Sequence, residues 1–223
     1  MSTVALKEGH AGSGSRRVAL TEAHHGSTAS RGWSGPAPKR IVTGYGFWIF
    51  ILSDMVMFSA FFATYAVLLG QTAGGPTGHD LFDLRNVAIE TALLLASSFT
   101  CGLASIAADT RNTAWFQLAM AITCVFGLGF LALEGREFAS LVAGGAGPTR
   151  SAFLSAFFML VGCHGLHVSA GILWLLTMMA QVLAKGFRPD IQRRILCFVL
   201  FWHALDIIWI AVFTIVYLLG SAT

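Results

Sequence analysis

Eight ionisable side chains lie within long apolar stretches of this 223-residue sequence. Each of them needs a partner, a water-filled cavity or a chemical role, because an isolated charge in hydrocarbon is unfavourable. Carboxyl and imidazole groups in this setting can relay protons, or the imidazoles can bind haem or a metal ion. The candidate site residues are Asp54, Glu90, Glu134, Glu137, His164, His167, His203 and Asp206.

The histidines have helical spacing. His164 and His167 are three residues apart, as are His203 and Asp206, so each pair shares one face of a helix. Both pairs fall near the middle of their apolar segments, and we expect a hydrogen-bonded cluster that joins the two helices, contributing about 1 kcal/mol or less per contact. The alternative is a haem or metal site, although a zinc or copper site would need three or four converging donors.

Two of the carboxyl groups, those of Glu90 and Asp54, lie inside apolar segments. Glu90 is about one turn inside the start of its segment, and Asp54 lies within the first segment. A buried carboxyl group suits proton relay, but it can equally serve as a structural group that is hydrogen-bonded to a neighbouring helix. Both interpretations remain open for Glu90 and for Asp54.

Two further carboxyl groups, those of Glu134 and Glu137, lie at the outer end of an apolar segment. Because this end is close to the membrane surface, we expect partial hydration or a salt bridge with Arg136 or Arg150.

The composition excludes an ordinary soluble domain. Hydrophobic residues make up 56% of the chain, charged residues only 11%, and the mean hydropathy is +0.71, whereas about a quarter of the residues of a soluble domain are charged. The four cysteines each stand alone in an apolar run, so neither a disulfide framework nor a zinc site is indicated. The net charge of +3 is better explained by membrane orientation than by a nucleic-acid partner.

Five apolar segments, each long enough to cross a hydrocarbon layer roughly 30 Å thick, predict an all-α polytopic membrane protein with a bundle of five transmembrane helices. All five prolines fall outside these segments. We expect residues 1–43 to form a flexible polar cytoplasmic tail and residues 44–223 to form the membrane domain. The predicted spans are about 46–70, 87–108, 114–133, 151–184 and 195–219.

The basic residues predict the orientation. Eleven of the 14 Lys and Arg residues lie in the tail and in the segments on the same side of the membrane, and three lie on the other side. Since Lys and Arg accumulate in cytoplasmic segments, the N-terminus is predicted inside and the C-terminus outside.

Residues 44–220 resemble subunit III of the haem-copper respiratory oxidases. The resemblance rests on several strings of residues that occur in the same order on the corresponding helices. They are Gly46-Phe47-Trp48 with Ser53-Asp54, Glu90-Thr91 with Ser97-Ser98, Glu134-x-x-Glu137-Phe138, His164-Gly165-Leu166-His167-Val168, and Phe201-Trp202-His203 with Asp206 and Trp209.

Within this family, the loop 72–82 and the five-span length are most similar to the bo-type ubiquinol oxidase subunit III. The resemblance implies an accessory subunit of a proton-pumping quinol oxidase in a bacterial inner membrane, with subunits I, II and IV as partners. It also implies that haems and copper lie in subunit I, that this chain holds no cofactor or catalytic residue, and that it binds phospholipid and supports assembly stability and sustained proton uptake.

Two alternatives remain. The nearest is subunit III of a bacterial cytochrome c oxidase. An alternative from another class is a small b-type cytochrome membrane anchor, in which His164 or His167 would bind haem together with His203. The family resemblance instead makes these histidines and Asp206 structural residues.

Overall fold

The computed structural model describes residues 39–74 and 83–222. Every regular element in these two ranges is helical, and five helical spans are long and apolar enough to cross a membrane. The predicted all-α class with five spans is therefore confirmed. The elements are α1 (Lys39–Leu68), α3 (Leu84–Asp109), α4 (Thr113–Ala143), α5 (Ala152–Lys185) and α6 (Pro189–Val212), which continues into the π-helix η1 (Phe213–Leu218) and the short α7 (Leu219–Ala222).

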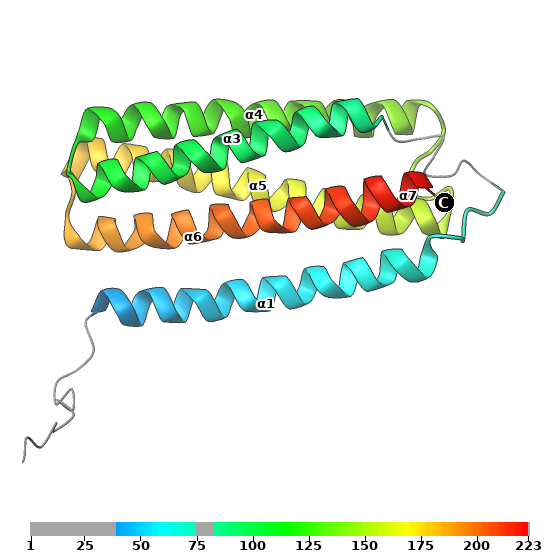
Figure 1. The fold of residues 1–223 in the computed structure, drawn as a ribbon, viewed down its shortest axis with the longest axis horizontal. Helices are drawn as coiled ribbons and strands as arrows, with labels where there is room; N and C mark the ends of the chain where they lie inside the picture. Colours follow the sequence, from blue (N-terminus) through cyan, green and yellow to red (C-terminus); the bar gives the residue numbers. More distant parts are fainter. Residues whose placement is uncertain (1–38, 75–82, 223) are drawn as a thin grey trace, which may run out of the picture. The chain divides into compact units, whose positions relative to one another are not determined.

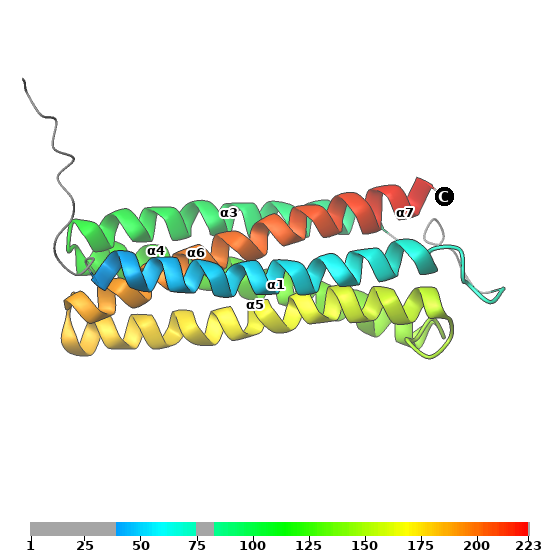
Figure 2. The same cartoon turned by 90° about the horizontal axis from the view of Figure 1, so that it is seen from below.

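Consecutive long helices run antiparallel (Figure 1). α3 and α4 pack side by side along their length, and α6 contacts α1, α3 and α5. Figure 2 shows α1 running along α5 and α6, which are its two main neighbours. α6 is the most buried of the five spans, whereas α1 is largely exposed. The polar residues of α6 are therefore the ones most constrained by tertiary packing.

Helix α4 extends well past its predicted end at residue 133. It continues to Ala143 and stops before Gly145, which adopts a positive φ of 78°. Hydropathy falls at Glu134, but Glu and Arg are good helix formers, so the helix does not end where the apolar run ends. Glu134 and Glu137 thus lie in the interior of a helix and not at its end.

The beginnings of two helices also differ from prediction. α1 begins at Lys39 and so extends into the predicted tail, of which residues 1–38 lie outside the described residues. α6 begins at Pro189, ahead of the predicted residue 195. Proline is favourable in the first turn of a helix because its missing N–H has no helical partner there.

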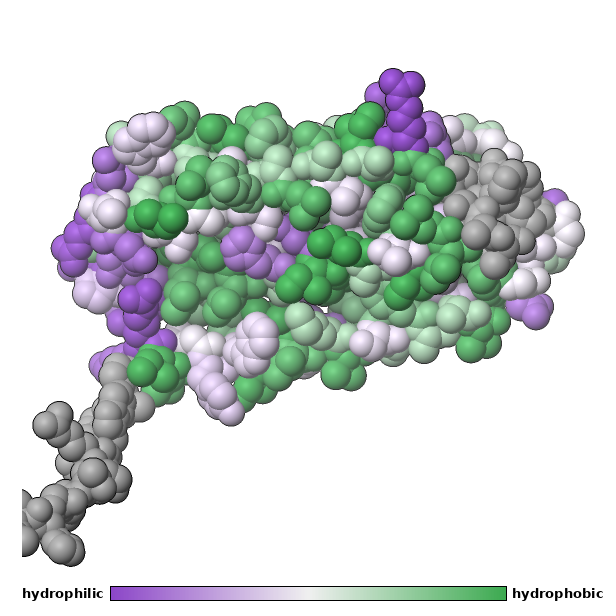
Figure 3. Space-filling model, in the orientation of Figure 1, coloured by the Kyte–Doolittle hydropathy of each residue, from purple (hydrophilic) through white to green (hydrophobic). Residues whose placement is uncertain are grey.

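Figure 3 shows one face of the protein with hydrophobic residues covering its middle. Hydrophilic residues gather at the end where α1 begins, and a separate hydrophilic patch interrupts the hydrophobic region midway along the helices. A hydrophobic band is what a membrane-spanning bundle requires, since lipid cannot solvate charges. The patch within the band is the exception that needs an explanation.

Candidate functional site: buried polar groups in the bundle

Three carboxyl side chains gather between α3 and α4. Glu90 is 0% exposed and Glu134 is 4% exposed, and the charges of Glu90, Glu134 and Glu137 lie within electrostatic range of one another. The buried Tyr217 of η1 faces the same group, with its hydroxyl directed at the Glu137 carboxyl. Carboxyl groups on two helices and a phenol on a third element therefore form one cluster, which we call the carboxyl cluster.

The π-helix η1 is bonded to α1 at the residue before Tyr217. The hydroxyl of Tyr65 on α1 donates a hydrogen bond to the carbonyl oxygen of Val216 at 3.2 Å. Short π-helical segments are frequent at functional sites, because they change which residues a helix presents to its neighbours. The position of Tyr217 depends on this segment.

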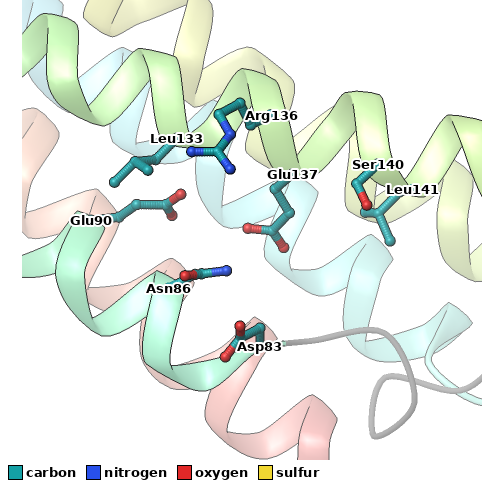
Figure 4. Close-up of a pocket in the computed structure, with 8 residues that line it drawn as sticks. All are labelled: Asp83, Asn86, Glu90, Leu133, Arg136, Glu137, Ser140 and Leu141. Carbon is teal, nitrogen blue, oxygen red and sulfur yellow. The ribbon is translucent and has the colours of Figure 1, made fainter.

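A pocket of about 320 Å³ opens beside the carboxyl cluster. Figure 4 shows Asp83, Asn86 and Glu90 on α3 and its N-terminal cap, opposite Arg136 and Glu137 on α4. The Asp83 carboxylate accepts a hydrogen bond from the backbone N–H of Arg85 at 3.0 Å and so caps α3. The pocket is large and polar enough to hold water, which could carry protons between the carboxyl groups.

The expectation of partial hydration is corrected for Glu134, whereas Glu137 is half-buried and lines the pocket. Glu134 is buried instead of partly hydrated. In the part of the chain that the structure describes, no ion pair joins either carboxylate to Arg136 or Arg150. α4 continues to Ala143, so Glu134 lies in the helix interior, on the side that packs inside the bundle.

His164 lies in an aromatic box. Its ring is fully buried and stacks on Trp209, with the ring centroids 5.1 Å apart, and it contacts Phe58 and Phe130 edge-on at 6.3 and 5.8 Å. Trp209 is held by its own hydrogen bond, in which Nε1 donates to the Thr91 hydroxyl at 3.1 Å. The contacts of His164 are those of a packing residue.

His167 and Asp54 lie together between α1, α5 and α6. Both line one small cavity, which is otherwise mostly apolar. The Nδ1 of His167 donates to the carbonyl oxygen of Cys163 at 2.7 Å, and its ring contacts Phe58 edge-on at 5.3 Å. The imidazole is therefore oriented by its own helix.

His203 and Asp206 face α3. The Nδ1 of His203 and the hydroxyl of Ser98 lie 2.5 Å apart. Asp206 is 5% exposed and also faces the Ser98 hydroxyl, but neither of its carboxyl oxygens has a hydrogen-bond partner of good geometry among the described residues. Ser98 thus lies between an imidazole and a carboxyl group.

The predicted hydrogen-bonded cluster of the two histidine pairs is not formed. Within the described ranges, His167 bonds to its own helix, His164 packs on aromatic rings, and His203 bonds to Ser98 of α3. The two pairs lie on adjacent helices, α5 and α6, but they face different neighbours. Among residues 39–74 and 83–222, no three His, Cys, Asp or Glu side chains converge into a ligand set for a metal ion.

Two polar residues of these sites were not among the predicted site residues. Ser98 occurs in one of the sequence strings quoted above, and Tyr217 follows the last of them along the chain. Hydroxyl groups carry no charge, so these two residues do not stand out in an apolar span. Helical spacing relates residues of the same helix, so it does not identify a partner on another helix.

These features define a polytopic membrane protein with polar residues buried between its helices and, among the described residues, a carboxyl-lined pocket. A family model described as cytochrome c oxidase subunit III matches residues 29–221. The chain belongs to the cytochrome c oxidase subunit III family, which confirms the predicted family.

Individual relatives agree with this assignment. The chain is 51% identical over 179 residues to the cytochrome bo(3) ubiquinol oxidase subunit 3 of Pseudomonas aeruginosa, covering 80% of this chain and 86% of that protein. It is 40% identical over 205 residues to the quinol oxidase subunit 3 of Bacillus subtilis, covering 90% of this chain and 98% of that protein. It is 41% identical over 175 residues to the cytochrome c oxidase subunit 3 of Bacillus sp. strain PS3, covering 78% and 84%.

Family membership and the five apolar spans together place the chain in the bacterial inner membrane as a multi-pass protein. It is a non-catalytic subunit of an oxidoreductase complex and therefore has partner subunits. The prediction of an accessory oxidase subunit is confirmed at this level, and the b-type cytochrome anchor is not supported by the family.

Proposed function

We propose that this chain is the accessory subunit III of a proton-pumping ubiquinol oxidase, which oxidises quinol and reduces oxygen to water. The observation that carries the proposal is the 51% identity, over 80% of the chain, to a relative named as a ubiquinol oxidase subunit. Its partners are subunits I, II and IV, and the haems and copper lie in subunit I. The role of this chain is to stabilise the assembly and to sustain turnover.

A second candidate is subunit III of a cytochrome c oxidase, which the 41% identity to the protein from Bacillus sp. strain PS3 favours. The two candidates differ in electron donor. A cytochrome c oxidase carries a dinuclear copper site in another subunit, whereas a quinol oxidase does not.

The carboxyl cluster and its pocket have a role in proton handling in this proposal. Glu90 and Glu137 line the pocket, and the buried Glu134 and Tyr217 lie within electrostatic range of them, so groups able to take up and release protons extend from the pocket into the bundle. Asp83 and Arg136 line the pocket and are exposed, which gives water access to the cluster.

Orientation follows from the distribution of basic residues over the helix ends. One end of the bundle carries seven Lys and Arg residues and the other carries three, and we place the richer end, where α1 begins, in the cytoplasm. The C-terminus and the pocket are then on the outer side. The seven are Lys39, Arg40, Arg111, Lys185, Arg188, Arg193 and Arg194.

We place phospholipid binding at an apolar groove of about 310 Å³ between α3 and α4. Leu103 and Ile122 line its apolar part, and Asn112 and Trp115 line its end near the α3–α4 turn. An acyl chain suits the apolar part, and a tryptophan beside a polar end is typical of the membrane interface. Lipid mass spectrometry of the complex, with Ile122→Trp as the blocking variant, tests this assignment.

The electron donor tests the proposed function most simply. Membranes that contain the complex, and the complex purified through a tag on this chain, should reduce oxygen with ubiquinol as donor and not with reduced cytochrome c. Oxidation of cytochrome c by a preparation that contains a dinuclear copper subunit would favour the second candidate. Absence of both activities from every preparation that contains this chain would reject both.

A further inference from the structure

Tyr65 is the last of three buried residues on α1. Ile51, Phe58 and Tyr65 are spaced by seven residues, so they form one stripe along a helix that is otherwise largely exposed. The ring of Tyr65 contacts Phe153 of α5, with the ring centroids 5.7 Å apart. Its hydroxyl reaches the carbonyl oxygen of Val216 and so ties the end of α1 to η1, at the same end of the bundle (Figures 1 and 2).

The π-helical register of η1 sets the direction of Tyr217. At the end of η1, the N–H of Leu219 bonds to the carbonyl oxygen of Thr214, five residues back instead of the four of an α-helix. One residue added to a turn changes the direction of the residues after it by about 100°, the angle between successive residues of an α-helix. An α-helix that continued from α6 without this change would therefore direct Tyr217 away from the Glu137 carboxyl that its hydroxyl faces.

The carbonyl oxygen of Val216 accepts two hydrogen bonds inside this segment. The Leu219 N–H donates one from the end of η1, and the Tyr65 hydroxyl donates the other from α1. A carbonyl oxygen has two lone pairs and can accept both. A side chain that inserts into the backbone ladder is a recognised cause of helix irregularity. The Tyr65 hydroxyl is a donor of this kind, so it favours the register that η1 adopts.

The bond from Tyr65 acts on the residue next to Tyr217, whose own ring has only aromatic packing to orient it. The Tyr217 ring contacts Phe157 edge-on and Trp209 at a tilt, with the centroids 6.0 and 6.2 Å apart. Such packing keeps the phenol inside the bundle but tolerates small rotations, whereas a hydrogen bond weakens steeply when it is misaligned. The approach of the Tyr217 hydroxyl to the Glu137 carboxyl therefore depends on the backbone of η1.

We infer that Tyr65 is a positioning residue for the carboxyl cluster, because its hydroxyl holds η1 in the register that directs Tyr217 at Glu137. The consequence for proton handling rests on the proposed function, whereas the positioning does not. The inference adds α1, which carries no member of the cluster, to the elements that set the geometry of the cluster.

The test removes the hydroxyl of Tyr65 and keeps its ring. Tyr65→Phe and Tyr217→Phe are made in the tagged chain, and the complex that contains it is purified. Tyr45→Phe on the same helix is the matched control, since Tyr45 is 68% exposed. The infrared carboxyl band of Glu137 is identified as the band that Glu137→Gln removes. The position of this band and the number of protons pumped per electron are measured for each variant.

We expect Tyr65→Phe to move the Glu137 band by more than half of the shift that Tyr217→Phe produces, while Tyr45→Phe leaves it in place. The variant that combines Tyr65→Phe with Tyr217→Phe should match Tyr217→Phe alone, because Tyr65 acts through Tyr217. A wild-type band in Tyr65→Phe would overturn the inference. A larger shift in the combined variant than in Tyr217→Phe would also overturn it, because Tyr65 would then act on the cluster by another route.

Proton pumping separates this inference from the proposed function. We expect Tyr65→Phe to lower the protons pumped per electron, or to shorten the working lifetime, to the level of Tyr217→Phe. A shifted band together with wild-type pumping and lifetime in both variants would support the positioning role of Tyr65. The same result would overturn the proposed role of the carboxyl cluster in proton handling.

Discussion

The imidazole of His164 lies against the indole of Trp209, with ring centroids 5.1 Å apart and an angle of 30° between the planes. Phe130 packs edge-on against the same indole at 4.6 Å. A histidine at mid-span in a respiratory membrane protein raises the question of haem ligation. Its neighbours in this bundle are aromatic rings, so its contribution is packing between α4, α5 and α6.

His164→Phe and His164→Ala separate packing from ligation. We expect His164→Ala to destabilise the subunit by about 2–4 kcal/mol, because it leaves a cavity among large rings. His164→Phe keeps a ring in the box and should lose less than half as much. The midpoint of thermal unfolding in mild detergent measures both. Equal damage from the two substitutions, together with loss of haem from the complex, would indicate a ligand role.

Gly171 on α5 is a close-approach position. A Cβ there would lie 2.9 Å from Cζ3 of Trp202 and 3.3 Å from Cε1 of Phe201. Trp202 cannot easily move aside, because its Nε1 donates to the Ser97 hydroxyl at 3.0 Å. We expect Gly171→Ala to destabilise the subunit by about 1–3 kcal/mol. Gly165→Ala on the same helix is the control and should be neutral or stabilising; unchanged thermal stability in Gly171→Ala would contradict the packing.

Glu90→Gln tests the proposed role of the carboxyl cluster. Glutamine keeps the size and polarity of the side chain but cannot release a proton, so assembly should be unchanged. We expect fewer protons pumped per electron, or a working lifetime shortened severalfold, in proteoliposomes. Asp109→Asn, an exposed carboxyl group at the other end of α3, is the control. Wild-type stoichiometry together with a wild-type lifetime in Glu90→Gln would leave Glu90 a packing role only.

His203→Ala removes the imidazole that bonds to Ser98. We expect it to loosen the subunit from its complex by about 1 kcal/mol, or roughly fivefold in the dissociation constant. His203→Gln, which can still form hydrogen bonds, should retain more of the complex. Occupancy of the subunit is measured by gel quantification after detergent washing, and occupancy equal to wild type in His203→Ala would count against the role of His203.

The spans could be predicted from the sequence, but the sites could not be fully predicted. Long apolar runs separated by Pro, Gly and charged residues determine the helices directly, as at Asp109–Thr113 and Gly144–Arg150. The end of α4 was missed because hydropathy falls at Glu134 whereas helix propensity continues to Ala143. The candidate residues were found because a charge in an apolar run is conspicuous.

The partners of those residues depend on how each helix is rotated about its axis. When a helix is apolar nearly all round, periodicity does not say which face meets which neighbour. His203 and Asp206 were therefore expected against His164 and His167 of α5, whereas the structure directs them to Ser98 of α3. Tyr217 was missed because the π-helix that carries it has no sequence signature, so the direction of its side chain could not be predicted.

The central claim is that this chain is a non-catalytic subunit of an oxidase complex, and the native mass of the complex tests it most directly. The complex is purified in mild detergent through a tag on this chain, and its mass and cofactors are determined together. We expect an assembly several times heavier than 23.8 kDa that contains haem and copper, with no dinuclear copper subunit if the donor is quinol. A species of about 23.8 kDa, or a small multiple of it, would contradict the account, and haem bound to that species would favour the b-type cytochrome anchor.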